Sequence, residues 1–290
     1  MKLSLTRIAT IVVAILVATV LVASASGCGV VNRIRAKNQL NEAARSYREG
    51  RFVEAEQHSR EAAQLDPDNK TAPIFIARTI HMQYRPGVQT PENIAKAQQA
   101  IEAYQQILEK NPQDEDAYKA VAYLYGAIKE DGKLREWITQ RATNEATEPT
   151  KRSEAYVVLA SKDWDCSFKI TELPTHKITT VDTSTNKATV SYKKPSDQKD
   201  FDTAKKCVTQ GLAEAENAIK FDPNNESAWS YKTNLLLEAS KLAEMDGQSE
   251  QKAQYQKEYE AALKRTTELS VANQKRKEEE ARQAASPPKG

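Results

Sequence analysis

Apolar residues recur at helical spacing along most of the chain. One stripe consists of Phe201, Ala204, Val208, Leu212, Ala215 and Ile219. A second stripe consists of Ala228, Trp229, Leu235, Leu236, Ala239 and Leu242. Because the steps of three and four match the 3.6-residue period of an α-helix, the pattern predicts amphipathic helices with one buried face.

Four proline-centred segments divide these helices. They are Asp66-Pro67-Asp68-Asn69, Asn111-Pro112-Gln113-Asp114, Glu148-Pro149-Thr150 and Asp222-Pro223-Asn224-Asn225. An alanine followed by a ring stands five or six residues beyond each proline, in Ala72-Pro73, Ala117-Tyr118, Ala155-Tyr156 and Ala228-Trp229. Proline ends a helix and an Asp or Asn caps the next, so the segments predict a series of helical hairpins in which these alanine–ring pairs are equivalent.

The first of these units resembles the second half of a tetratricopeptide repeat, in Gly50-Arg51-Phe52, Glu54-Ala55, Ala62 and the turn that ends at Asn69. The resemblance implies a period of about 34 residues and an all-α, right-handed solenoid of about five helix pairs, from about Ala36 to Leu269, with a concave binding face. The prolines are 45, 37 and 74 residues apart. The excess lengths are then insertions between the two helices of a pair. A plain helical bundle is the alternative.

Two insertions distinguish this chain from a regular series of 34-residue repeats. The first contains Arg85-Pro86-Gly87-Val88-Gln89, after which Thr90 is expected to cap a helix that begins at Pro91 and ends near Lys110. The second, about Asp165 to Lys199, contains two β-branched runs that predict a β-hairpin, Lys177–Val181 and Ala188–Tyr192. The hairpin is expected to lean on the helices, because two strands alone are marginally stable. It either covers part of the groove, offers an edge to a partner strand or has no binding role.

The N-terminal segment is typical of an export signal. Lys2 and Arg7 precede an uncharged run from Ile8 to Val31. Ala25-Ser26-Gly27-Cys28-Gly29 resembles the lipobox of bacterial lipoproteins, which implies removal of residues 1–27, acylation of Cys28 (palmitate among the acyl chains) and a periplasm-facing protein of the cell envelope. Plain secretion after cleavage at Ala25 and an uncleaved apolar anchor helix remain as alternatives. Residues 28–35 are expected to be a linker.

Two further cysteines bracket the second insertion. If Cys28 carries lipid, Cys166 and Cys207 are the remaining thiols, and they face an oxidising compartment. We therefore predict a disulfide between them that closes the base of the hairpin, worth about 3–4 kcal/mol for a loop of this length. Buried free thiols are the alternative.

Composition argues against catalysis and nucleic-acid binding. The chain has 42 Lys+Arg and 40 Asp+Glu, and removal of residues 1–27 balances them, so the mature chain has no basic field for nucleic acid. Nine glycines and three histidines leave little for phosphate loops or metal chemistry. His58, His81 and His176 have no ligand partner at metal spacing, so they are expected to be surface or packing residues. We predict no enzyme activity, no cofactor and no small-molecule substrate.

The predicted function is a membrane-anchored scaffold that binds other polypeptides. Similar lipoproteins serve as assembly factors, and that role is implied by resemblance alone. By helical phase, the residues expected to face the groove are Tyr47, Arg48, Lys119, Tyr123 and Asn234. The alternative is a structural spacer of the envelope whose hairpin makes the only contact. Residues 271–290 are expected to form a polar helical tail that frays by Ser286.

Overall fold

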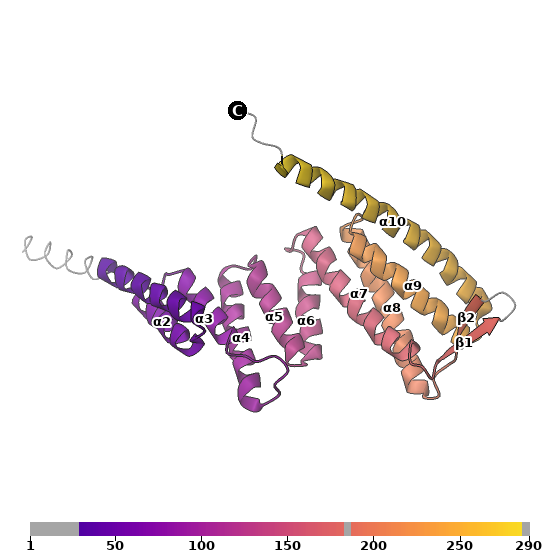
Figure 1. Ribbon diagram of the computed structural model, residues 1–290, viewed down its shortest axis with the longest axis horizontal. Helices are drawn as coiled ribbons and strands as arrows, with labels where there is room; N and C mark the ends of the chain where they lie inside the picture. Colours follow the sequence, from indigo (N-terminus) through magenta and orange to yellow (C-terminus); the bar gives the residue numbers. More distant parts are fainter. Residues whose placement is uncertain (1–28, 183–186, 286–290) are drawn as a thin grey trace, which may run out of the picture. The chain divides into compact units, whose positions relative to one another are not determined.

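The computed structural model describes residues 29–182 and 187–285. These residues form five successive helix pairs and one β-hairpin, so the predicted all-α, tetratricopeptide-like class is confirmed (Figure 1). The chain divides into two compact units, Met1–Leu134 (unit 1) and Arg135–Gly290 (unit 2). The predicted signal segment 1–27, Cys28 and the frayed end 286–290 lie outside the described residues. In the part that is described, no helix is both long and apolar enough to span a bilayer.

Unit 1 is built from short helices with small residues where they cross. Its elements are a helix over residues 29–48, α2 (Phe52–Leu65), α3 (Thr71–His81), α4 (Pro91–Lys110), α5 (Glu115–Ala127) and the start of α6 (Asp131–Thr143). Ala36, Ala62 and Ala72 are fully buried together, and Leu40 and Leu65 pack around them. Alanine lets the helix backbones approach closely, so each pair buries its stripe against the next.

The turns between pairs are built as the sequence predicts in three of the four cases. Asn69 accepts a hydrogen bond from the Ala72 amide at 3.0 Å, and Asp114 accepts one from Ala117 at 2.9 Å. Asn225 accepts the equivalent bond from Ala228 at 3.2 Å. Each cap satisfies an amide of the first helical turn, which has no partner within the helix. The alanines at 72, 117 and 228 therefore occupy equivalent places.

The third segment, Glu148-Pro149-Thr150, differs from the prediction. Pro149 does not lie in the turn; it is the first residue of α7, and Glu148 precedes it without a side-chain cap. Ala155-Tyr156 consequently lies one helical turn deeper in its helix than Ala117-Tyr118 does, and the expected equivalence of this pair is wrong. The residues that precede α5 and α7, Asp114 and Glu148, are 34 positions apart, so this repeat carries no insertion.

The first insertion is a short ordered loop. Thr90 caps α4, Pro91 is its first residue and the helix ends at Lys110, all as predicted. The Asn93 side chain accepts from the Arg85 amide at 2.8 Å and donates to the Arg85 and Val88 carbonyls at 2.8 and 2.7 Å. The buried Asn93 side chain thus supplies hydrogen-bond partners to the loop backbone. These bonds explain why the longer connection is ordered.

Unit 2 uses longer helices. They are α7 (Pro149–Thr171), α8 (Gln198–Phe221), α9 (Glu226–Met245) and α10 (Ser249–Ala285). The predicted stripe of α8 is buried through Phe201, Ala204 and Val208, which pack on Ala239 and Leu242 of α9. Leu212 of the same stripe is only partly buried against this core.

Two predicted boundaries are wrong. The second insertion comprises residues 172–197, since α7 continues to Thr171 and α8 starts at Gln198, whereas the prediction was Asp165 to Lys199. Residues 29–35 are helical and not a linker. Residues 271–285 of the predicted polar helical tail are the end of α10, which is one helix from Ser249 to Ala285. α7 continues through residues 165–171 because this stretch has no proline or glycine to end the helix.

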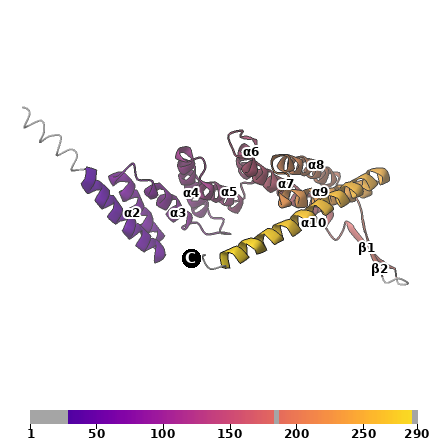
Figure 2. The same cartoon turned by 90° about the horizontal axis from the view of Figure 1, so that it is seen from above.

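The predicted hairpin is confirmed. β1 (Lys177–Asp182) and β2 (Lys187–Tyr192) are antiparallel, with Thr179 opposite Val190. The hairpin is fastened at its base, where the Tyr192 amide donates to Glu244 of α9 at 3.1 Å. Beyond the base it extends away from the helices of unit 2, and Ile178, Val181 and Val190 are 48%, 53% and 40% exposed (Figure 2). It does not lie along the helices as a cover.

Candidate functional site

Unit 1 carries a group of rings, which we call the tyrosine cluster: Tyr47, His81 and Tyr123 on first helices of the pairs, and Tyr104 on the second helix α4. The His81 ring of α3 lies 5.7 Å from the Tyr123 ring of α5 and 5.8 Å, edge-on, from the Tyr104 ring of α4. Tyr47 is half-buried, and its ring meets that of Phe52 edge-on at 5.4 Å. After burial, Tyr47 is one of the smaller causes that raise the pKa of Tyr104. Tyr123 is 51% exposed. The cluster therefore has a buried floor and an accessible ring.

Burial favours the uncharged forms of Tyr104 and His81. It raises the pKa of the Tyr104 hydroxyl to about 12, since the ionised form would be poorly solvated. Burial also lowers the pKa of His81 below its usual range. His81 Nδ1 lies 3.3 Å from the Tyr104 hydroxyl. A neutral imidazole and three phenol rings offer flat apolar area with hydrogen-bonding tips, the chemistry that suits polypeptide contacts.

Charged side chains surround this cluster. Arg78 of α3 pairs with Asp116 of α5 at 3.5 Å, and both are well exposed. Arg48 and Lys119 are exposed, and among the described residues no carboxylate pairs with either. Cations that are not neutralised beside accessible rings can hold carboxylates or the ring faces of a bound chain.

Four of the five predicted groove residues lie in unit 1: Tyr47, Arg48, Lys119 and Tyr123. The fifth, Asn234, is half-buried on α9 of unit 2, so the structure does not bring it together with the other four within one unit. His81 and Arg78 were missed by the sequence argument. Their signal was present in principle, because they lie three residues apart on one face of α3, but a histidine and an arginine at this spacing are common on solvated helices.

Unit 2 has its own group of rings on its first helices. Trp164 of α7 lies 4.9 Å from Phe168 on the same helix and 6.1 Å from Tyr231 of α9. The Lys241 ammonium lies 5.4 Å from the centre of the Phe168 ring. Asn234 is one turn from Tyr231 along α9. This group was also missed, since the spacing of Trp164 and Phe168 is equally typical of core packing.

Behind these rings lies a buried charge network. Glu238 of α9 is 1% exposed and accepts hydrogen bonds from Ser167 at 2.9 Å, Thr171 at 2.6 Å and Lys241 at 2.6 Å. Lys241 also donates to Glu172 at 2.6 Å. Each charge has a partner, as burial requires. The network joins α7, α9 and the residue that starts the second insertion.

Glu172 connects this network to the hairpin. Although burial alone would raise its pKa, hydrogen bonds from Lys177, Lys241 and Tyr192 lower the pKa of Glu172 to about 2. For Lys241, burial opposes the charge, while its bonds to Glu172 and Glu238 raise its pKa above the usual value. Both groups are therefore ionised at neutral pH, and their role is to fix the hairpin base.

A disulfide joins the helices on either side of the second insertion. Cys166 of α7 and Cys207 of α8 are bonded, with Cα atoms 6.2 Å apart. The bridge lies inside the two helices and not at the hairpin base, because α7 continues for five residues beyond Cys166. It therefore clamps the α7–α8 pair, and the charge network anchors the hairpin.

The three histidines are engaged in local contacts. His58 Nδ1 lies 2.7 Å from the Gln39 side-chain oxygen, and His176 Nδ1 lies 2.8 Å from the Ile170 carbonyl. Within residues 29–182 and 187–285, no group of three or more His, Cys, Asp or Glu side chains is placed to hold a metal ion.

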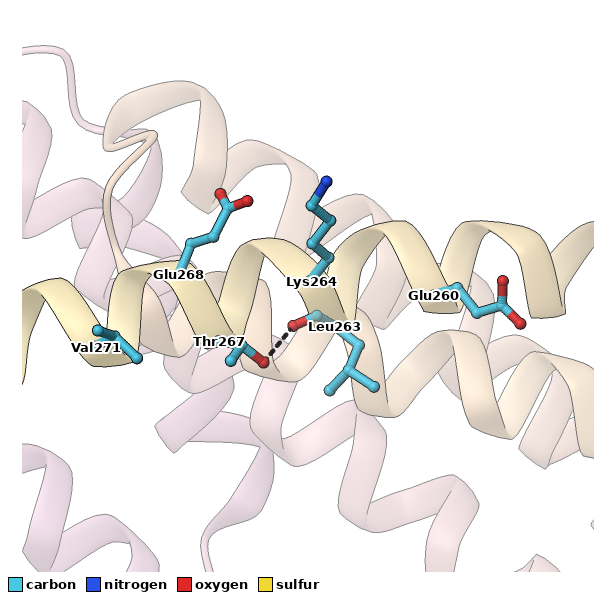
Figure 3. A pocket seen from close by; sticks show the side chains of 6 residues that line it. All are labelled: Glu260, Leu263, Lys264, Thr267, Glu268 and Val271. Atoms are coloured by element: carbon cyan, nitrogen blue, oxygen red, sulfur yellow. Dashed lines mark hydrogen bonds between the residues drawn. The ribbon is translucent and has the colours of Figure 1, made fainter.

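An open hollow of about 700 Å³ lies along α10. Figure 3 shows its lining on one side of this helix, with Leu263, Thr267 and Val271 one turn apart and Thr267 donating to the Leu263 carbonyl at 2.9 Å. Its lining also includes the charged residues Glu260, Lys264 and Glu268. All six come from a single helix, so we assign the hollow no ligand.

No protein-family model matches the chain, and no curated protein sequence matches it. Among solved structures, MamA (residues 41 to the end) from Desulfovibrio magneticus RS-1 is similar at 11% identity and a TM-score of 0.37, over 83% of this chain and 96% of that one. A tetratricopeptide repeat protein from Parabacteroides merdae is similar at 13% identity and a TM-score of 0.33, over 82% and 99%. The TPR2AB domain of yeast Sti1, in a complex with pHSP90, is similar at 15% identity and a TM-score of 0.28, over 81% of this chain and 96% of that one.

All three TM-scores lie below 0.5, so the fold assignment depends on the helix pairs of the chain itself. The capped turns at Asn69, Asp114 and Asn225 and the stacking of successive helices within each unit define a tetratricopeptide-like protein.

Proposed function

We propose that this chain is a non-catalytic scaffold that binds other polypeptides through the tyrosine cluster of unit 1. The observation that supports this proposal is the accessible Tyr123 ring beside His81, with the exposed Lys119 one turn before Tyr123 on α5 and the exposed Arg48 next to Tyr47. A bound chain would stack on the rings and place its carboxylates near the cations. Arg and Tyr are the residue types that most often dominate protein interfaces.

The scaffold is held at the cell envelope by lipid on Cys28, facing the periplasm. Support for this part comes from the uncharged run Ile8–Val31 and the lipobox-like Ala25-Ser26-Gly27-Cys28. Several acyl chains on one residue are sufficient for stable anchoring. A role in assembly of other envelope proteins would follow from a scaffold in this place.

Site-specific photocrosslinking in intact cells tests the binding site. We expect a photoreactive residue at Tyr123 to yield a discrete adduct that disappears when Arg48→Gln and Lys119→Gln are introduced. The matched control is the same probe at Val53, which is 69% exposed on α2. Adducts of equal yield from both positions, or none from Tyr123, would reject the tyrosine cluster as the binding site.

A second candidate is a structural spacer whose hairpin makes the only contact. The exposed Ile178, Val181 and Val190 favour it, since three β-branched residues in water on a projecting ribbon are unusual. The same experiment separates the two candidates. Discrete adducts from a probe at Ile178, with none from Tyr123, would support the spacer.

Labelling tests the lipid anchor. In cells given radioactive palmitate, we expect label on the natural chain and its loss in the Cys28→Ala variant. An inhibitor of the lipoprotein signal peptidase should cause the uncleaved form to accumulate. An unlabelled natural chain would reject lipidation and favour the uncleaved helix or plain secretion.

A further inference from the structure

The first described helix extends beyond the helices that it packs against. Its first well-buried residue is Ala36, which meets Ala62 and Ala72, with Leu40 and Leu65 alongside. Residues 29–35 come before these contacts, and all except Asn32 are exposed. About two helical turns therefore project from unit 1 at the end where residues 1–28 join it.

The projecting turns carry an apolar face in water. Val30 and Ile34 are each 58% exposed and Val31 is 48% exposed. With about 100° of rotation per residue, these three side chains fall within an arc of about 100°. The buried Ala36 and Ala43 and the partly buried Leu40 lie on the opposite arc. The exposed face therefore points away from the packing face, and no helix among the described residues 29–134 covers it.

Three cations flank this apolar face. By the same rotation, Arg33 and Lys37 lie on one side of it and Arg35 lies on the other. All three are exposed, and no carboxylate of the described residues pairs with any of them. In addition, the sequence contains no acidic residue before Glu42. This local excess of positive charge is exceptional in a chain whose charges otherwise balance.

We infer that residues 29–37 lie on a lipid surface that carries anionic headgroups, with Val30, Val31 and Ile34 at the acyl boundary and Arg33, Arg35 and Lys37 on headgroup phosphates. An apolar stripe between Lys or Arg side chains is the pattern of interfacial helices, whose cations reach outward to the headgroups. The sequence indicates what covers this face: the described helix begins one residue after Cys28, and the uncharged run extends to Val31. This inference rests on the proposed attachment to a membrane.

The contact is electrostatic as well as apolar. Cationic residues near an anionic surface each strengthen binding about fivefold, and the effect decays over a Debye length. The lipid on Cys28 then supplies attachment, while the helix sets how the start of unit 1 meets the membrane.

Hydrogen exchange on the full chain in lipid vesicles tests this inference. One vesicle is phosphatidylcholine alone, and the other contains phosphatidylcholine and phosphatidylglycerol at about 7:3. Flotation with the neutral vesicle tests attachment, and it fails if the anchor proposal fails. Terminal turns of a helix exchange quickly when free. We expect amides of residues 30–37 to exchange on the order of tenfold more slowly in the anionic vesicle, with the difference lost in 0.5 M salt.

Neutralisation shows whether these cations are responsible. Arg33→Gln, Arg35→Gln and Lys37→Gln together should abolish the difference between vesicles while flotation is retained. The matched control neutralises three exposed lysines of α10, Lys257, Lys264 and Lys275, and should leave the difference unchanged. Equal exchange in both vesicles, or a difference that survives in the first triple variant, would overturn the inference.

Discussion

The two units solve the same packing problem with different means. Unit 1 stacks short helices through buried alanines, keeps its ion pairs on the surface and leaves cations open around the tyrosine cluster. Unit 2 stacks longer helices, closes them with the Cys166–Cys207 bridge and buries a charge network around Glu238. A surface with open polar groups is available for binding, whereas buried, fully paired groups fix geometry. Under the proposed function, recognition would belong to unit 1, whereas the buried network of unit 2 holds the hairpin base.

The chain offers separate probes for the two units. Trp137, Trp164 and Trp229 are the three tryptophans of the sequence, and all belong to unit 2. Tryptophan fluorescence therefore follows unit 2, and hydrogen exchange of α4 amides follows unit 1.

Removing the central cation of the buried network should have the largest effect. Lys241→Met leaves the Glu238 carboxylate buried without its cation, so we expect unit 2 to lose about 3–5 kcal/mol of unfolding free energy. Urea unfolding followed by tryptophan fluorescence measures the loss. The matched control is Lys232→Met on the same helix, whose partner Glu216 is exposed, with an expected change below about 1 kcal/mol. Equal losses in the two variants would contradict a special role for the buried network.

Opening the disulfide should come next. Cys166 and Cys207 close a loop with a sequence separation of 41, so Cys166→Ser with Cys207→Ser is expected to cost unit 2 about 3–4 kcal/mol. Exchange in α4 should not change, since the bridge lies outside unit 1. Destabilisation of both units by the same amount would show that they unfold as one body and would break the comparison.

Replacing a glycine with alanine should change the stability of the two units in opposite directions. A Cβ at Gly211 of α8 would lie 2.7 Å from Leu235 Cδ2 and 3.0 Å from Asp163 Cβ, so Gly211→Ala is expected to destabilise unit 2 by about 1–3 kcal/mol. Gly132 of α6 has nothing within 4 Å of such an atom. Gly132→Ala should stabilise its helix by up to about 1 kcal/mol, because alanine has the higher helix propensity. Thermal unfolding measures both, and a loss at position 132 would contradict the open packing there.

Acid should lower the unfolding free energy of the two units in different pH ranges. Of the four predicted changes in stability, we expect this one to be the smallest. Burial lowers the pKa of His81, so in unit 1 its contribution is complete above the ordinary value of 6.5 and declines as the pH falls below it, where the unfolded chain takes up a proton first. The pKa of Glu172 falls from 4.5 to about 2, so its contribution to unit 2 is complete above 4.5 and is lost as the pH falls toward 2.

Variants assign these two ranges to their residues. Exchange of α4 amides between pH 7 and 5.5 should become less pH-dependent in His81→Gln, and acid unfolding monitored by tryptophan fluorescence should become less steep in Glu172→Gln. Profiles that the two substitutions leave unchanged would show that other groups control the acid response.

Much of the fold could be predicted from local signals. Turn residues such as Asp114 and Asn225 satisfy amides only a few positions away, so the caps can be identified from the sequence. The strand pairing of the hairpin follows from two β-branched runs separated by a short polar turn. Pro149 shows the limit of such signals, because a proline is equally acceptable in a turn and at the first position of a helix.

Less of the candidate site could be predicted, because its contacts join distant parts of the chain. Helical phase identified Tyr123 and Lys119 but not His81. The His81 ring contacts Tyr104 and Tyr123, which are 23 and 42 positions further along the chain. Helical phase also included Asn234, since it gives the direction of a side chain and not the unit in which its neighbours lie.

The sequence by itself determined the helix pairs, their capped turns, the hairpin and the pairing of the two cysteines that bracket it. These depend on backbone geometry within a few residues or on a short inventory of thiols. The tertiary structure alone decided that Glu238 and Lys241 are buried partners and that Glu172 holds the hairpin base. In the sequence these residues look like any solvated helix face, and only packing against Ser167 and Thr171 removes the water that would otherwise make their pairing weak.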